Sequence, residues 1–317
     1  MPALIRNGVA IDVGAGAASD VGAGAASGDG FAEAFDMRAT ALVITAPELR
    51  WARQAAVSMT GFATSVIGCG VEAGIDAELD PAATPDGRPG VRVLLCAAST
   101  AELQKQLAAR VGQCVLTSPG SACYAGLEGA ERLPLGNALR YFGDGWQIAK
   151  RFGDRRFWRV PVMDGEFVCE ATTGLTKQAV GGGNLLLASR SAASALRAAE
   201  AVAAAVAATP GAIAPFPGGI VRSGSKVGSK YKAAPASTND AWCPTLAGLV
   251  DSALDPETRA VLEVVIDGLT AEAVAAAMRA GLAAATALGP DAGAHRIGAG
   301  NYGGRLGRHH FYLRELL

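Results

Sequence analysis

The feature that most constrains the fold is an order of short apolar runs and helical segments that occurs twice along the chain. In the first half, apolar runs at 41–45, 63–69, 91–97 and 113–117 predict four strands. One helical segment lies between the first two runs and another between the last two. This β-α-β-β-α-β order is typical of a ferredoxin-like sandwich, in which an antiparallel sheet packs on two helices.

Helix start signals support this order. Thr45-x-x-Glu48 and Ser99-x-x-Glu102 both have the spacing of a capping box, in which side chains at a helix start bond backbone N–H groups. In the second half, Thr270 is expected to cap another helix. The sequence therefore predicts an α+β protein with two ferredoxin-like (split βαβ) lobes, and the cleft between them is the default ligand site.

The expected boundary between the lobes lies at residue 147. Residues 1–147 form the N-terminal lobe, and residues 148–317 form the C-terminal lobe with an insertion at 222–258. Residues 12–27 repeat the octapeptide DVGAGAAS. Such a Gly/Ala/Ser tract cannot bury enough surface to order a core, so we expect a flexible surface segment without chemistry.

Composition excludes several classes of protein. The 317 residues include 28 Lys+Arg and 29 Asp+Glu, and the net charge of −1 argues against a dedicated nucleic-acid binder. The three histidines are all in the last 23 residues, and no histidine or cysteine motif has the spacing of a zinc site. We therefore expect no metal site and no Ser-His-Asp triad.

Membrane insertion and secretion are also not expected. The most apolar stretches, 192–208 and 271–288, are mostly alanine and contain charged residues, unlike a membrane helix. The first residues lack the apolar core of a signal peptide. The six cysteines form no C-x-x-C pair, and reduced thiols fit an ordinary cytoplasmic protein.

Polar, glycine-rich segments are the first candidates for a site. They lie at 181–184, 215–230, 235–245 and 297–307, and none matches a nucleotide-binding loop. Each is compatible with a tight turn or with a backbone that approaches a ligand closely. Three of the six lysines, Lys226, Lys230 and Lys232, fall within seven residues. This cluster is compatible with a solvated loop or with a receiver for an anionic substrate.

Glu263 is the main candidate for chemistry. It alternates with Val261 and Val265 along an apolar strand, so its carboxylate would lie between two valines. Desolvation there would raise its pKa and suit it to general acid–base catalysis. From the strand pattern alone, an edge-strand glutamate that points into water is the preferred interpretation.

Several longer strings resemble the formylmethanofuran:tetrahydromethanopterin formyltransferase family. The matching strings keep their order from Phe31 onward and extend over nearly the whole chain. They are FAEAF (31–35), TGFATSVIGCGVEAGID (60–76), TPDGRPGV (84–91), GQCVLT (112–117), FGDG (142–145), PFPGGIV (215–221), SKVGSK (225–230), PASTNDAWCPT (235–245) and AGNYGGRLG (299–307).

The resemblance implies a reaction and a site. The family has two α+β lobes and transfers a formyl group between N5 of tetrahydromethanopterin, or its dephospho form, and the primary amine of methanofuran. It uses no metal and no tightly bound cofactor. Its proposed catalytic glutamate precedes a Gly-Leu turn, which places that role on Glu263 before Gly268-Leu269. The residues expected to bind substrate are Asn184, Ser225, Lys226, Lys230, Thr238, Asn239 and Asp240.

Oxyanion donors are left open between the glycine-segment N–H groups and the amides of Asn184 and Asn239. Asp240 is the next candidate for the proton transfer if Glu263 is structural.

Departures from the archaeal members favour the bacterial branch of the family. The chain is nearly neutral, and the repeat at 12–27 is extra. The resemblance then implies the transferase component of a formyltransferase/hydrolase complex, with amidohydrolase-type partner subunits and flow from formaldehyde towards formate. We also expect a homo-oligomer. The alternative is a catalytically weak scaffold or cofactor-carrier subunit of a formyl-hydrolysing complex.

Overall fold

The structure is a computed structural model that describes residues 3–13, 30–224 and 226–317. The chain divides into two compact units. Unit 1 comprises Met1–Asp36 and Val180–Leu317, and unit 2 comprises Met37–Ala179. The part of the DVGAGAAS repeat from residue 14 to residue 27 lies outside the described residues.

The chain passes between the units inside two long strands, β3 (Phe31–Thr45) and β13 (Thr176–Ser189). This division differs from the boundary expected at residue 147. The sequence between 148 and 179 groups with the first half of the chain, because its strands extend the sheet of unit 2.

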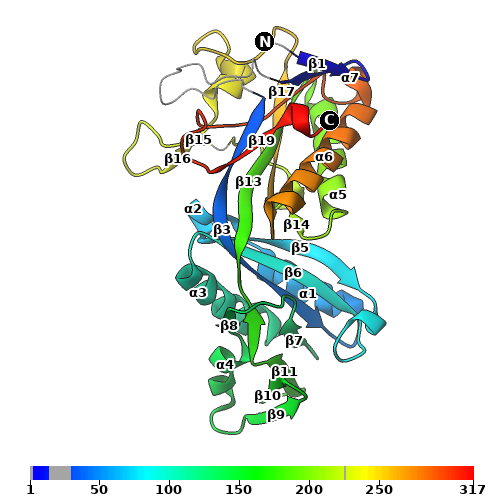
Figure 1. Ribbon diagram of the computed structural model, residues 1–317, viewed down its shortest axis with the longest axis vertical. Helices are drawn as coiled ribbons and strands as arrows, with labels where there is room; N and C mark the ends of the chain where they lie inside the picture. Colours follow the sequence, from blue (N-terminus) through cyan, green and yellow to red (C-terminus); the bar gives the residue numbers. More distant parts are fainter. Residues whose placement is uncertain (1–2, 14–29, 225) are drawn as a thin grey trace. The chain divides into compact units, whose positions relative to one another are not determined.

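Unit 2 is built on four strands in the order β5-β6-β3-β7, which are antiparallel to their neighbours. Strand β11 adds parallel to β7, and β10 and β9 follow in antiparallel pairs (Figure 1). Besides β3, the elements are α1 (Leu49–Thr60), β4 (Thr64–Ser65), α2 (Val66–Cys69), β5 (Val71–Leu79), β6 (Gly90–Ala97), α3 (Thr100–Arg110), β7 (Ala122–Ala125), β8 (Arg132–Pro134), α4 (Gly136–Leu139), β9 (Ile148–Phe152), β10 (Arg155–Val162), β11 (Gly165–Glu170) and β12 (Thr172–Gly174).

The start of α3 is as predicted, and the start of α1 is not. The Ser99 hydroxyl accepts the backbone N–H of Glu102, which satisfies one of the free donors of the first turn. Helix α1 instead begins after Glu48, which makes no side-chain cap bond. The predicted capping residue Thr45 lies in β3, where its hydroxyl donates to Asp86 at 2.7 Å.

Two predicted strands of unit 2 are wrong. The run at 113–117 continues helix α3 as a π-helical turn, Val111–Val115, because Val111 and Val115 lie on one helical face and are both buried. The fourth strand is β7. The run at 63–69 contains only the short strand β4 and helix α2, and the long second strand is β5, which follows it.

Unit 1 has a matching core with strand order β18-β13-β17-β14, again antiparallel throughout. Strand β2 adds parallel to β18, and β19 pairs with the first residues of β3. Besides β13, the elements are β1 (Ala3–Arg6), β2 (Val9–Asp12), α5 (Ala192–Ala207), β14 (Ala212–Ile213), β15 (Lys226–Val227), β16 (Ala236–Ser237), β17 (Ala260–Gly268), α6 (Ala271–Ala287), α7 (Gly289–Ala292), β18 (Arg296–Gly298) and β19 (His309–Tyr312).

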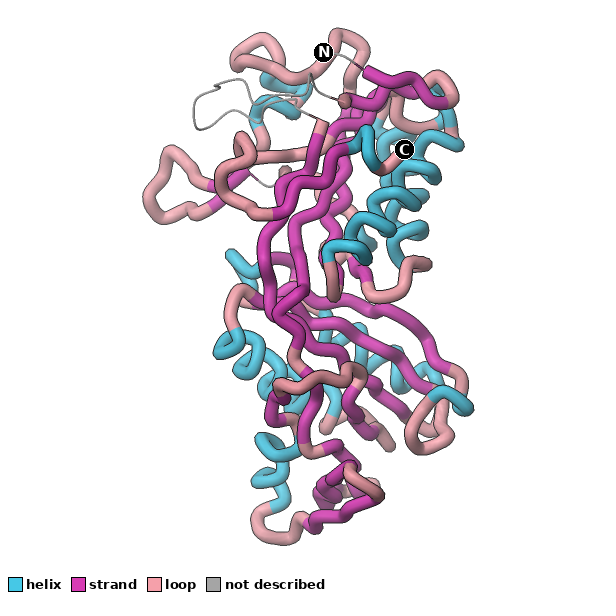
Figure 2. Tube along the Cα trace, in the orientation of Figure 1, coloured by secondary structure: helices cyan, strands magenta, loops and turns pink. Residues whose placement is uncertain are grey.

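Helices α5 and α6 lie side by side along the sheet of unit 1 (Figure 2). Their small residues allow close packing: a Cβ at Gly281 would lie 2.9 Å from Val202. Thr270 accepts the N–H of Ala273 and caps α6 as predicted. Within the described residues, no helix has the length and apolar character needed to cross a membrane.

Candidate functional site

Glu263 lies in the interior of the unit 1 sheet. On one side it is opposite Leu186 of β13. On the other side its N–H donates to the carbonyl of Val221 at 2.9 Å, and the N–H of Val221 donates back at 2.7 Å. The side chain is 3% exposed. The edge-strand interpretation is therefore wrong, and the carboxylate is buried.

The carboxylate of Glu263 points away from the helices. Side chains alternate between the two faces of a strand, and the neighbouring Val264 and Ile266 belong to the apolar core formed with α5 and α6. Glu263 therefore faces the opposite side of the sheet, together with Val265 and Asp267. We call this side the polar face of unit 1.

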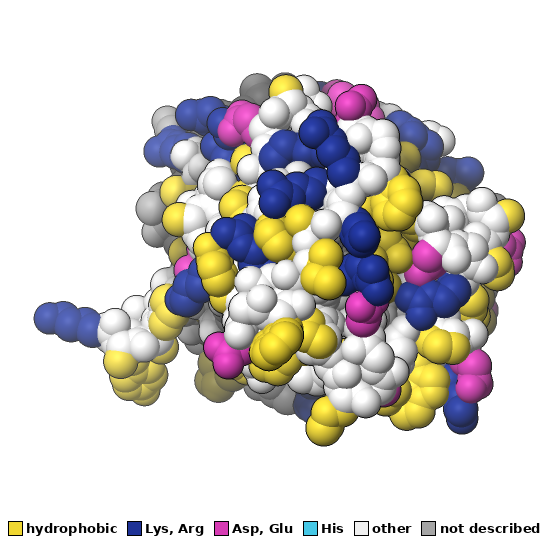
Figure 3. Space-filling view, turned by 90° about the horizontal axis from the view of Figure 1, so that it is seen from below, with side chains coloured by type: hydrophobic (Ala, Val, Ile, Leu, Met, Phe, Trp, Pro, Cys, Tyr) yellow, Lys and Arg dark blue, Asp and Glu magenta, His cyan; other side chains and the backbone are white. Residues whose placement is uncertain are grey.

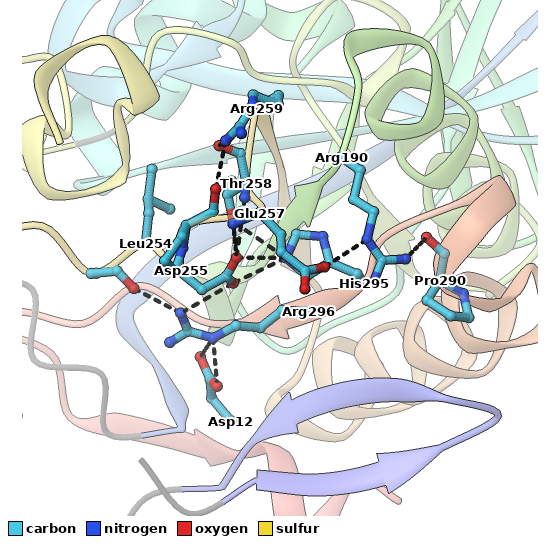
Figure 4. A network of polar contacts seen from close by, with 12 residues as sticks. Asp12, Arg190, Leu254, Asp255, Glu257, Thr258, Arg259, Pro290, His295 and Arg296 are labelled. Atoms are coloured by element: carbon cyan, nitrogen blue, oxygen red, sulfur yellow. Dashed lines mark hydrogen bonds and ion pairs between the residues drawn. The ribbon is translucent and has the colours of Figure 1, made fainter.

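The insertion at 222–258 covers part of the polar face. Trp242 is buried against β18, since a Cβ at Gly298 would lie 2.7 Å from its ring. The Arg296 guanidinium lies 5.6 Å from the centre of that ring. It donates to Asp12 Oδ1 at 2.9 Å and to the carbonyl of Ala253 at 2.7 Å, which ties the insertion to the sheet (Figure 4).

A second tie holds the end of the insertion. His295 Nε2 lies 3.0 Å from Asp255 Oδ2, and Asp255 also accepts the N–H and hydroxyl of Thr258 (Figure 4). Burial acts to raise the pKa of Asp255, but the hydrogen bond and charge of His295 and the bonds from Thr258 outweigh it and lower the pKa. The contact of His295 with Asp255 thus ties the end of the insertion to the residue before β18.

The lysine cluster lies on a small hairpin of this insertion, formed by β15 and β16. Lys226 Nζ donates to Asp240 at 2.9 Å, and this contact lowers the pKa of Asp240. Lys230 is exposed and makes no ion pair within the described residues. Ser225 lies outside the described residues. Thr238 is exposed, with its hydroxyl 3.3 Å from the sulfur of Cys243.

The two candidate asparagines differ in their contacts. Both amide protons of Asn184 are engaged, since Nδ2 donates to the carbonyls of Gly182 and Gly300 at 3.1 Å each, and Oδ1 accepts the N–H of Gly300 at 2.6 Å. Asn239 is half-buried, and its side-chain amide makes no hydrogen bond to the described part of the chain. A Cβ added at Gly224 would lie 2.8 Å from the backbone nitrogen of Asn239, and Gly224 is three residues from Val221, the bridge partner of Glu263.

The glycine loop at 299–307 is organised by a residue that sequence reasoning missed. Glu33 is 1% exposed, and its two carboxylate oxygens accept four backbone N–H groups of this loop at 2.6–2.9 Å. The donors are Tyr302, Gly304, Leu306 and Gly307. These N–H groups are therefore engaged within the protein. The signal in the sequence was an acidic residue inside the apolar string FAEAF.

Burial alone acts to raise the pKa of Glu33. The hydrogen bonds from the four backbone N–H groups outweigh this effect, and the pKa lies below its ordinary value. Gly307 is required for the arrangement, because a Cβ there would lie 2.3 Å from the carbonyl oxygen of Ala34. Across residues 3–13, 30–224 and 226–317 there is no group of three or more His, Cys, Asp or Glu that could hold a metal ion.

The fold and this face define a class: a two-lobed α+β protein with a buried carboxylate in the central strand of one lobe, beside a loop insertion that carries lysines and polar side chains. Two sequence models match the chain. "Formylmethanofuran-tetrahydromethanopterin formyltransferase" matches residues 23–162, and "FTR, proximal lobe" matches residues 165–316. The chain belongs to the formylmethanofuran–tetrahydromethanopterin formyltransferase family.

Similar proteins extend over nearly the full length. The formylmethanofuran–tetrahydromethanopterin formyltransferase of Methylococcus capsulatus is 60% identical over 90% of this chain and 96% of its own. A subunit of the formyltransferase/hydrolase complex of Methylorubrum extorquens is 60% identical over 91% of this chain and 94% of its own. A crystal structure of that complex, FhcABCD, with methylofuran contains a chain with TM-score 0.92 and 55% identity, with coverage of 100% and 99%.

The contacts of Glu33 generate a stability prediction. Glu33→Gln removes the charge and turns an NH₂ group towards backbone donors, so the free energy of unfolding should fall by about 3 kcal/mol. Because the folded-state pKa of Glu33 is lowered, its contribution is fully present above about pH 4.3, the ordinary value for glutamate. The contribution is lost as the pH falls through the folded-state pKa.

Urea unfolding followed by circular dichroism at pH 7 and pH 3 measures both effects. Glu78→Gln removes a carboxylate whose side chain is 40% exposed and is the matched control, with an expected change under about 0.5 kcal/mol. Equal unfolding midpoints for Glu33→Gln and the wild type at pH 7 would contradict the role assigned to Glu33.

Proposed function

We propose that this protein transfers a formyl group between N5 of tetrahydromethanopterin and the primary amine of methanofuran. The observation that carries the proposal is the 60% identity to a named formyltransferase over 90% of the chain. Both coenzymes are substrates, and the reaction needs no tightly bound cofactor. The test is conversion of formyl-tetrahydromethanopterin and methanofuran by the purified chain alone. Failure to form formylmethanofuran would leave the scaffold or carrier role instead.

Glu263 is proposed as the general acid–base group. During transfer the attacking amine loses a proton, and the departing pterin nitrogen gains one. A carboxylate that accepts the first proton and donates it to the leaving nitrogen balances the step without a covalent enzyme intermediate. The buried position of Glu263 on the polar face supports this role, since a site that excludes water strengthens such interactions.

Asn239 is proposed as an oxyanion donor. The tetrahedral intermediate carries a negative oxygen that needs N–H donors already in place. Asn239 has an amide that is not engaged within the described chain, whereas Asn184 donates to the carbonyl of Gly182 in β13 and to the carbonyl of Gly300 in the glycine loop. Asn184 is therefore proposed to position the loop rather than to contact the oxyanion.

The hairpin of the insertion is proposed to bind anionic parts of the substrates. Lys226 and Lys230 supply positive charge, and Asp240 orients Lys226 through their ion pair. Ser225 and Thr238 complete the proposed binding set from the same segments. Lys226 is half-buried and paired, so it contributes a fixed donor, and the exposed Lys230 contributes long-range attraction.

Each unit is proposed to have a ferredoxin-like core. The order β5-β6-β3-β7 in unit 2 and β14-β17-β13-β18 in unit 1 supports this, because both match a split βαβ arrangement with two helices in the connections. The proposed N-terminal and C-terminal lobes then correspond to these two cores. Unit 1 also contains Met1–Asp36 from the N-terminal half, and unit 2 also contains residues 148–179 from the C-terminal half.

The physiological setting is proposed from the relatives. One of them is a subunit of the formyltransferase/hydrolase complex of Methylorubrum extorquens, so we infer that this chain assembles with hydrolase subunits and acts in the direction of formate release. Homo-oligomers are also proposed, supported by the small-residue stripes of α5 and α6. All six cysteines are free, which supports a reducing, cytoplasmic location.

The acid–base proposal is tested with Glu263→Gln, which keeps the shape of the side chain but removes proton transfer. Turnover should fall by about 10²–10⁴-fold with little change in KM, because the group acts mainly in the transition state. Steady-state assays on variants with wild-type circular dichroism measure this, with the exposed Glu48→Gln as control. Near-wild-type turnover of Glu263→Gln would make the carboxylate structural and would shift attention to Asp240.

The asparagines give a paired prediction. Asn239→Ala should lower kcat by about 10²–10³-fold, as for loss of one oxyanion donor, with little effect on stability. Asn184→Ala should instead lower the unfolding midpoint, because two carbonyls and one N–H lose their partner. Steady-state kinetics and urea unfolding of both variants measure these effects. If Asn184→Ala lowered kcat and Asn239→Ala lowered the unfolding midpoint, the two proposed roles would be exchanged.

Variants of the two hairpin lysines distinguish a role in substrate binding from a role in the chemical step. Lys226→Ala and Lys230→Ala should each raise KM and weaken its dependence on ionic strength, with kcat nearly unchanged. KM is measured between about 20 mM and 500 mM salt, a range over which the Debye length falls several-fold. Lys105→Ala, an exposed lysine on α3, is the control. Salt profiles that overlay the wild type would exclude the hairpin from substrate binding.

A further inference from the structure

Unit 2 carries a basic and aromatic segment that the proposed reaction does not use. Residues 140–159, which we call the basic hairpin, include β9, the start of β10 and the turn before them. The segment has only two acidic residues, in a chain with net charge −1. Its six cations are Arg140, Lys150, Arg151, Arg155, Arg156 and Arg159.

Large apolar side chains are exposed along the same segment. Four aromatic residues are between 67% and 78% exposed: Tyr141, Phe142, Trp146 and Phe152. Figure 3, seen from the end at which β9 and β10 lie in Figure 1, shows Lys and Arg side chains gathered with hydrophobic ones between them. Burying these side chains against water-excluded partner surface would be favourable.

Two of the six cations are neutralised by neighbouring carboxylates. Arg155 pairs with Glu170, and Arg159 pairs with Glu166. Within the described residues, the other four cations make no ion pair: Arg140, Lys150, Arg151 and Arg156. The guanidinium carbons of Arg140 and Arg156 each lie 4.8 Å from the Trp158 ring centre. These two charges are therefore held in place on a folded surface.

A simpler explanation is protection of an edge strand. Strand β9 is the last strand in its sheet, and cations on an edge discourage aggregation. Protection of an edge strand needs only charged side chains. Exposed aromatic side chains such as Trp146 and Phe152 would favour aggregation instead. Arginine together with tryptophan, tyrosine and phenylalanine, with lysine rare, is the composition enriched in protein–protein interfaces and their hot spots.

We propose that the basic hairpin is a docking surface for an acidic face of a partner protein, namely the hydrolase subunits. The inference rests on the proposed function, in which this chain takes the place of its relative in the Methylorubrum extorquens complex. Charge complementarity indicates the occupant. Four cations without an ion pair among the described residues favour carboxylates opposite them, and the exposed aromatic side chains favour a packed protein surface.

The experiment uses the FhcABCD complex of Methylorubrum extorquens prepared without the component that resembles this chain, which we call the partner assembly, and the full-length chain. Binding is measured by biolayer interferometry at low and physiological salt. Arg151→Glu/Arg156→Glu should weaken binding by at least about 100-fold, and Trp146→Ala/Phe152→Ala by at least about 10-fold. The control Arg50→Glu/Lys105→Glu has the same charge change on exposed residues of α1 and α3 and should stay within about twofold.

Formyl transfer by each isolated chain is measured in parallel. Loss of binding with normal transfer activity in both test variants supports the proposal. Failure of an active wild-type chain to bind the partner assembly, or equal binding by all variants, overturns it and leaves the proposed function intact. An inactive wild-type chain would instead refute the proposed function.

Two other occupants would also overturn the proposal. If only the charge variant loses binding and heparin competes with the partner assembly, the surface recognises a polyanion rather than a folded protein face. If light scattering shows that the charge variant dissociates a wild-type homo-oligomer, the surface is an interface between copies of this chain.

Discussion

Buried carboxylates on one face of the unit 1 sheet determine how the rest of that unit is arranged. Asp12, Glu33, Glu263 and Asp267 are at most 3% exposed, and each is next in sequence to a residue of the apolar core. A charge removed from water must be hydrogen-bonded. Three of these carboxylates therefore fix specific segments: the loop at 302–307, the Arg296 side chain and the bulge of β13 at Gly182.

These ties compensate for a core of small side chains. Five of the thirteen buried residues of α5 and α6 are alanine, which offers little apolar area per residue, and the helices approach closely at Gly281. The polar face gains its order from directional bonds instead. Asn184 connects the β13 bulge to Gly300, and Glu33 holds the next residues of the same loop. These bonds fix the backbone of β13, whose neighbouring strand β17 carries Glu263.

Local signals in the sequence predicted local structure well. Ser99 and Thr270 cap their helices because cap and donor are three residues apart. The run at 113–117 misled, because Gly112 was interpreted as the end of the helix, although Val115 continues the helical face of Val111. The nest around Glu33 could not be predicted, since acceptor and donors are about 270 residues apart in the chain. Burial of Glu263 followed from the resemblance, whereas the strand pattern alone favoured an exposed edge-strand glutamate.

The two units repeat one strand order and differ in what was added to it. Unit 1 gained the insertion that carries Trp242 and the lysine hairpin, and Trp242 packs over the polar face at Gly298. Unit 2 gained β9, β10 and β11 at the end of its sheet, away from the helices α1 and α3 in strand order. An addition over the face of a sheet can enclose reacting groups, whereas an addition at its edge extends the outer surface. The proposed acid–base group and the proposed docking surface lie in different units, so a change in the docking surface need not alter the residues around Glu263.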